Sequence, residues 1–183
     1  MLDINFNPFP VIETERLILR RLNETDLPGI FFVRSDERMM KYIDLPRFVT
    51  EEEAVPYMAK LEKFLQDNEG INWAVTIKGE EKLIGRICLF NFAKQHFRAE
   101  LGYMLFPEYQ GKGIIQEALQ PVLDYGFRHL QLHTIEANVN PDNEASIKVL
   151  ERNKFVREAY FKENYFYNGK FMDTAVYSLI TPY

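Results

Sequence analysis

The chain has 183 residues, of which 46% are hydrophobic and 27% charged, with a formal net charge of −5. These values predict one globular domain over residues 1–183 and argue against broad binding to nucleic acid or to an anionic membrane. The single cysteine, Cys88, excludes an internal disulfide and a cysteine-based zinc site, and the N-terminus lacks a signal-peptide pattern, so we expect a cytoplasmic protein. The sequence is compatible with either a monomer or a homodimer.

The first third of the chain predicts one strand and two capped helices. A weakly alternating strand covers residues 16–21. Asn23 and Asp26 can cap a helix that reaches about Arg34. Thr50 with Glu53 forms a capping box for a helix that reaches about Asp67, and Gly70 is expected to end this helix. Residues 36–49, between these helices, are expected to be irregular.

The middle of the chain predicts a hairpin and a third strand, followed by a helix. Residues 71–77 and 82–91 are the two strands of the hairpin, and residues 97–106 form the third strand. A turn with two glycines then leads into a helix that extends to about His129, whose apolar positions lie on one side.

The last third alternates strands and helices. A strand is expected over residues 132–139, a short helix over 141–152, and two final strands near 154–163 and 170–180. Asn168-Gly169 joins the last two strands as a hairpin. The order of elements predicts an α/β (α+β) fold with a mixed, mostly antiparallel sheet of about seven strands and helices on both faces.

The glycine turn is the clearest candidate for a ligand site. Its residues lie between a strand and a helix, where glycine allows close backbone approach and unpaired helix N–H groups favour an anion such as pyrophosphate. The segment is Gln110, Gly111, Lys112, Gly113, Ile114 and Ile115. A turn that binds nothing remains the alternative. Gln116 excludes a dinucleotide fingerprint, and Gly113 after Lys112 excludes a Walker-type loop.

Longer motifs carry a family resemblance. Residues 100–105, followed by residues 107–113 (PEYQGKG), resemble the coenzyme A signature of the GNAT superfamily of N-acetyltransferases. Residues 13–17, 143–155 and 167–170 resemble the opening strand, a late helix with its following strand, and the closing hairpin of the RimJ/RimL branch. The resemblance covers nearly the whole chain, and the motifs occur in the family's order.

The resemblance implies a binding site for acetyl-CoA and no metal. The pyrophosphate would bind the backbone amides of Gly111 to Ile115, and the pantetheine arm would lie near Leu105, where two central strands splay apart. Asn143 would bond the same arm. The sequence departs from the family at Ile115, usually a small residue, and at Lys154, usually a glycine.

The resemblance also implies two catalytic residues. Glu100 would act as the base that takes a proton from the amine, directly or through water, unless it pairs with Arg86 or Arg98 across the sheet. Ser146 would lie near the departing thiolate, because Leu150 occupies the position of the family's usual tyrosine acid. For Asn143 and Ser146 the alternative is a purely local role at a helix start.

Three acceptor hypotheses follow. The branch implies a protein N-terminal α-amine, with ribosomal proteins as the leading partners. The alternatives are a small amine, such as a polyamine or an antibiotic, and a non-catalytic acyl-CoA-binding protein. Cys88 is expected in the core, and His129 and His133 are separated by a helix end, which disfavours a shared metal ion. The tyrosine-rich closing hairpin could line an acceptor cleft or pack against the sheet or a second copy.

Overall fold

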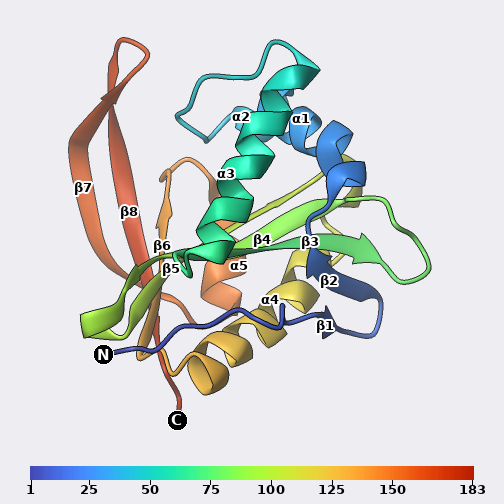
Figure 1. The fold of residues 1–183 in the computed structure, drawn as a ribbon. Coiled ribbons are helices and arrows are strands. Elements are labelled where there is room, and N and C mark those ends of the chain that lie inside the picture. Colours follow the sequence, from blue (N-terminus) through green and yellow to red (C-terminus); the bar gives the residue numbers. More distant parts are fainter.

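One mixed sheet of eight strands organises the chain, and the computed structural model describes all of residues 1–183 (Figure 1). The strand order is β1-β2-β3-β4-β5-β6-β8-β7. The strands are β1 Ile12–Glu13, β2 Leu17–Arg21, β3 Gly70–Ile77, β4 Gly85–Ala93, β5 Arg98–Leu105, β6 Thr134–Val139, β7 Val156–Tyr167 and β8 Lys170–Ile180. The expected mixed α/β fold is confirmed, with one strand more than the seven expected, since the two-residue β1 is too short to show a pattern.

Five α-helices accompany the sheet. They are α1 Leu27–Ser35, α2 Glu37–Met40, α3 Ala54–Gln66, α4 Ile114–Asp124 and α5 Glu144–Arg152, and a π-helical segment, Tyr125–His129, continues α4. No helix is long and apolar enough to cross a membrane.

The capping boxes of the sequence are present, and both open as short 3-10 turns. Asn23 and Asp26 bond each other's backbone, as do Thr50 and Glu53. The expectation that residues 36–49 are wholly irregular is wrong, because this segment contains α2. The Asp36 side chain caps the start of α2 by accepting hydrogen bonds from the N–H groups of Arg38 and Met39. Gly70 does not end α3 but belongs to β3.

The helices cover both faces of the sheet. Along β3, Trp73 and Val75 belong to the main core beneath α4, whereas the intervening Ala74 packs in a smaller core with residues of α1 and α3. This alternation follows the two-residue period of a strand and continues into the neighbouring strands. The sheet therefore has an α4–α5 face and an α1–α3 face (Figure 1).

The centre of the sheet opens between β5 and β6. These strands form the only parallel pair, and their register runs only from Arg98↔Thr134 to Glu100↔Glu136. Beyond Glu100, β5 stays paired with β4 as far as Leu105, while β6 stays paired with β8 as far as Val139. The two strands therefore diverge after Glu100, which confirms the expected splay.

The β7–β8 hairpin extends away from the helices, and its outer part lies near the segment before α3 (Figure 1). The hydroxyl of Tyr165 in β7 donates a hydrogen bond to the carboxylate of Asp44, which lies between α2 and α3. This contact joins the hairpin to the loop at the edge of the α1–α3 face.

Candidate active site

The glycine turn has the backbone geometry that an anion site needs. Gly111 and Gly113 have φ values of 73° and 74°, in the left-handed region that favours glycine. Gly113 is the N-cap of α4, and no side chain caps this helix start. The first N–H groups of α4 therefore have no intrahelical partner and can donate to a ligand.

Two neighbouring segments brace this turn. Gln110 folds back, and its Nε2 donates to the Leu105 carbonyl oxygen at 2.9 Å. Arg16 donates from Nη1 to the Lys112 carbonyl oxygen at 3.1 Å, and its Nε lies 2.6 Å from Glu117 Oε2. Gln110 is thus a support of the turn in this geometry, and it leaves the backbone donors free.

The sequence reasoning missed Arg16 and Glu117 as supports of the site. Burial raises the pKa of Glu117, but hydrogen bonds from Thr14 and Arg16 outweigh this effect, so the pKa lies below its usual value. Glu117 remains charged and holds the β1–β2 turn against the start of α4. Thr14 and Arg16 lie in the opening segment that resembles the family, which was the available signal for this contact. No local sequence rule connects them to Glu117, about a hundred positions away.

The side chains of the hydrophobic residues at and before the turn point into the core, so only their backbone atoms are available to a ligand. Leu105 and Ile114 are buried members of the main core, and Ile115 packs against the same core. Ile115 therefore replaces the family's small residue without its side chain occupying the exposed side of the turn. Lys112 lies at the surface, with its ammonium 5.6 Å from the centre of the Tyr109 ring.

Glu100 lies where the pairing of β5 and β6 ends, on the α1–α3 face. Its Oε2 accepts a hydrogen bond of 2.9 Å from Asn91 Nδ2. The alternative partners are absent, because Arg98 pairs with Glu136 and Arg86 stands opposite Met104 in the sheet register. The Glu100 carboxylate is therefore half-buried and bonded to a neutral amide, without an ion-pair partner.

Ser146 lies on the other face and has an unexpected partner. The Tyr103 hydroxyl oxygen is 2.8 Å from Ser146 Oγ and 3.2 Å from the Ser146 carbonyl oxygen. Burial raises the pKa of Tyr103 to about 12, against an opposing effect of the hydrogen bond with Ser146. Tyr103 therefore keeps its proton at neutral pH and can orient the serine hydroxyl.

Asn143 is the N-cap of α5, and its Oδ1 accepts a hydrogen bond of 3.2 Å from the Ser146 N–H. The local role weighed for Asn143 is thus present, and it is compatible with a further bond from Nδ2 to a ligand. Leu150, at the position of the family's usual acid, is completely buried in the core. No side chain from that position of α5 reaches the opening.

Glu100 and Ser146 flank the opening from opposite sides. Alternation along β5 places Glu100 and Gly102 on the α1–α3 face and Tyr103 on the α4–α5 face, where it meets Ser146. A carboxylate therefore lies on one side of the splayed strands and a hydroxyl pair on the other.

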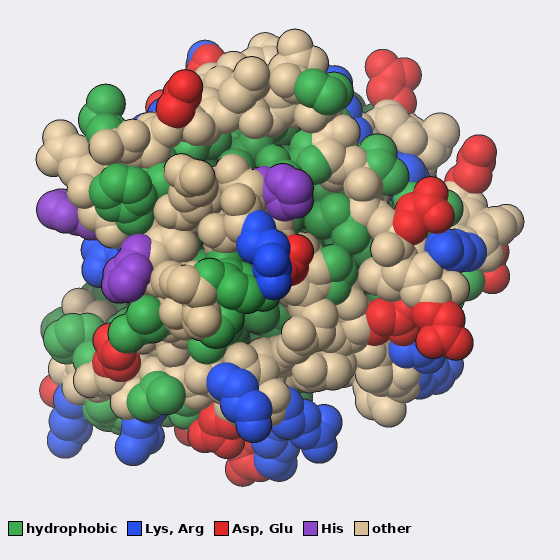
Figure 2. All heavy atoms as spheres, turned by 90° about the horizontal axis from the view of Figure 1, so that it is seen from below, with side chains coloured by type: hydrophobic (Ala, Val, Ile, Leu, Met, Phe, Trp, Pro, Cys, Tyr) green, Lys and Arg blue, Asp and Glu red, His purple; other side chains and the backbone are tan.

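Cys88 lies on the α1–α3 face next to Gly102, and its Sγ is 3.4 Å from the Gly102 carbonyl oxygen. Burial raises the pKa of this thiol, while the positive charge of Arg86 opposes the shift. A protonated thiol is a poor nucleophile. The histidines also stand apart on the underside of the molecule (Figure 2), and no group of three or more His, Cys, Asp or Glu side chains is placed to hold a metal ion.

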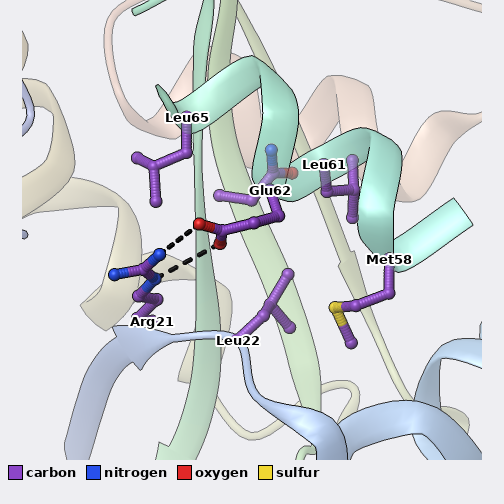
Figure 3. A pocket seen from close by; sticks show the side chains of 7 residues that line it. Arg21, Leu22, Met58, Leu61, Glu62 and Leu65 are labelled. Carbon is purple, nitrogen blue, oxygen red and sulfur yellow. Dashed lines mark hydrogen bonds and ion pairs between the residues drawn. The ribbon is translucent and has the colours of Figure 1, made fainter. Parts of the chain in front are cut away.

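A second hollow, between β2 and α3, is not a ligand site. It is lined mainly by Leu22, Met58, Leu61 and Leu65, and the Arg21–Glu62 ion pair closes it (Figure 3). Its free volume is only about 10 Å³. The opening between β5 and β6 has a different origin, because it forms where the pairing of these two strands ends at Glu100 and Glu136.

An uncapped glycine turn at a helix start and a sheet split beside it are features of an acyl-CoA-dependent transferase. The family model of the acetyltransferase (GNAT) domain matches residues 16–156, and the chain belongs to this family. It is an N-acetyltransferase that uses acetyl-CoA, and the uncapped turn and the splayed strands fit that co-substrate.

Three similar proteins place the chain more closely. The uncharacterized N-acetyltransferase YoaA of Bacillus subtilis (strain 168) is 35% identical over 174 residues, which cover 95% of this chain and 98% of YoaA. The ribosomal-protein-S5-alanine acetyltransferase of Vibrio fischeri is 29% identical, with a TM-score of 0.79 and coverage of 94% and 97%. The spermidine N-acetyltransferase of Vibrio cholerae, solved with CoA and spermine, is 28% identical, with a TM-score of 0.79 and coverage of 90% and 95%.

Proposed function

We propose that the acceptor is the N-terminal α-amine of a protein, as in the RimJ/RimL branch, with ribosomal proteins as the leading candidates. The observation that carries this proposal is the carboxylate of Glu100, held by Asn91 beside the opening, while its neighbour Glu136 pairs with Arg98. An α-amine has a reference pKa of about 7.7–8.0, against about 10.4 for lysine, so one modest base is enough to deprotonate it. The similar ribosomal-protein acetyltransferase supports the same acceptor.

In the proposed reaction each side of the opening has one task. The glycine turn, Gly111 to Ile115, holds the pyrophosphate of acetyl-CoA through backbone N–H groups. Glu100 takes the proton of the amine, directly or through water. The hydroxyl of Ser146, oriented by Tyr103, lies on the side where the thiol group of the coenzyme departs.

The spermidine acetyltransferase of Vibrio cholerae supports a second candidate, a polyamine acceptor. The test is a competition in one reaction. The enzyme is incubated with acetyl-CoA, N-terminal peptides of ribosomal proteins, spermidine and an aminoglycoside, and the products are mapped by mass spectrometry. Acetylation of peptide N-termini supports the proposal, whereas acetylation of spermidine alone transfers the function to the second candidate.

A further inference from the structure

Two arginines converge on one tyrosine ring on the α1–α3 face. The guanidinium carbon of Arg34, near the end of α1, is 5.0 Å from the centre of the Tyr57 ring, and that of Arg86, on β4, is 5.6 Å from the same centre. Arg34 also lies 4.7 Å from the ring of Phe48. Aromatic rings can hold guanidinium groups in this way, but they do not neutralise two positive charges.

Neither arginine has a carboxylate partner. Arg34 has only 7% of its surface exposed, and its one hydrogen bond is from Nη2 to the Pro46 carbonyl oxygen at 3.0 Å. Arg34 Nε and Arg86 Nη1 are the two buried side-chain polar atoms of the chain that lack a hydrogen-bond partner. By contrast, the buried Asp26 pairs with Arg20 at 2.8 Å.

A buried positive pair of this kind is unfavourable unless an anion approaches it. Buried charges are normally paired, and an unpaired donor loses its hydration without compensation. The whole chain carries a net charge of −5, so carboxylates are plentiful elsewhere on it. The missing counter-charge at Arg34 and Arg86 therefore indicates a ligand group.

The pair shares its sheet face with Glu100. In the pairing of β4 with β5, Arg86 stands opposite Met104, and Phe90 stands opposite Glu100. The interval between the two positions is four residues, or about 13 Å along the strand. Between these two positions, a Cβ added at Gly102 would lie 3.0 Å from Cys88 Sγ. The glycine therefore keeps this part of the sheet face free of a side chain.

We propose that Arg86 and Arg34 bind a carboxylate of the acceptor while its amine lies near Glu100. This inference rests on the proposed function and narrows its substrate class to an α-amine with a carboxylate one to three residues away. Such a carboxylate belongs either to an acidic side chain near a protein N-terminus or to the free end of a short peptide. A polyamine, which is purely cationic, would be repelled by the pair.

The test compares acceptors that differ in one charge. Peptides with aspartate or asparagine at the second and third positions, all amidated at the C-terminus, test the side-chain source. Tripeptides with a free or an amidated C-terminus test the other source. For the wild type, we expect kcat/KM, from the release of free thiol, to be at least tenfold higher for the charged member of at least one pair.

Arg86→Gln removes the charge and keeps a polar side chain. In this variant we expect the ratio of kcat/KM for the charged acceptor to kcat/KM for the neutral acceptor to fall close to one. The KM for acetyl-CoA should not change. Arg152→Gln makes the same charge change at an exposed position of α5, outside the α1–α3 face, and should keep the preference. If Arg86→Gln does not fold, the wild type should still be inhibited more strongly by the acetylated acidic peptide than by its amide form.

The outcomes separate the two proposals. Equal rates with charged and neutral peptides in the wild type, or an unchanged preference in Arg86→Gln, would overturn the carboxylate site and leave the N-terminal acceptor standing. Acetylation of free short peptides, but not of longer N-termini, would support the site and overturn the protein acceptor. Acetylation of spermidine alone would overturn the proposed function, and the carboxylate site with it.

Discussion

The Tyr103 hydroxyl and Ser146 Oγ lie 2.8 Å apart, so a strand residue and a helix residue meet beside the opening of the sheet. We expect Tyr103→Phe to lower kcat about tenfold, because the serine hydroxyl loses the partner that orients it. The KM for acetyl-CoA should change little. Ser146→Ala should have an effect of at least the same size.

The double variant of Tyr103 and Ser146 tests whether the pair acts as a unit. Its loss of kcat should be close to that of Ser146→Ala alone, since contacting residues in one hydrogen-bond network are not additive. Losses that multiply would show that Tyr103 acts independently of Ser146.

Glu100→Gln tests the base. We expect kcat/KM to fall by about a hundredfold, with the largest loss at low pH, where most of the amine is protonated and depends on a base. Raising the pH toward the pKa of the amine should restore part of the rate. Glu80→Gln, in an exposed turn, is the control, and an unchanged pH–rate profile for Glu100→Gln would remove Glu100 from this role.

Gly113→Asp tests the pyrophosphate site. Acetyl-CoA at a hundred times its Kd should stabilise the wild type by about 2.7 kcal/mol, seen as a higher Tm. The variant should lose this stabilisation, because a negative charge enters the anion site. Gly79→Asp is a matched control: Gly79 also has a positive φ, 84°, with no atom within 4 Å of an added Cβ, so backbone strain is similar while coenzyme binding should persist.

Cys88→Ala tests direct transfer. Burial raises the pKa of the Cys88 thiol, so little thiolate is present to attack a thioester. The variant should keep most of the activity, and intact-mass measurement of the wild type with acetyl-CoA should show no stable acetyl adduct. An acetylated Cys88 that passes its group to the amine would contradict direct transfer.

Lys154→Gly tests a departure from the family pattern. Lys154 follows α5 with a φ of 69°, a conformation that costs a residue with a side chain about 1–2 kcal/mol more than it costs glycine. We expect the variant to be more stable by up to about 1 kcal/mol, because the relief of this strain exceeds the additional conformational entropy that glycine loses on folding. Urea unfolding measures the gain, and the kinetic constants should not change.

Short-range patterns predicted most of the fold. The capping boxes at Asn23 and Thr50 and the hairpin at Asn168-Gly169 depend on neighbours within a few positions, and all three are present. The helix α2 was missed because its four residues are too few for a periodic signal. Its start depends on two hydrogen bonds that the backbone N–H groups of Arg38 and Met39 donate to the Asp36 carboxylate.

The site was less predictable than the fold. The family motif located the glycine turn and Glu100, but the bond between Tyr103 and Ser146 and the brace between Arg16 and Glu117 join residues 43 and 101 positions apart. Which side chains meet over such separations depends on the packed sheet. The partner of Glu100 was also not predictable. An arginine was considered, but the structure pairs Glu100 with Asn91, which lies at an irregularity in the β4–β5 register.

The coenzyme opening is made by the path of the main chain, since β5 keeps its pairing with β4 after its pairing with β6 has ended. No side chain has to move to create it. In the proposed arrangement, substitutions on the α1–α3 face, at positions such as Arg86, would therefore change which amine is accepted and leave the slot for the acyl donor intact. Such a division lets one scaffold diversify its acceptors during evolution while the donor stays the same.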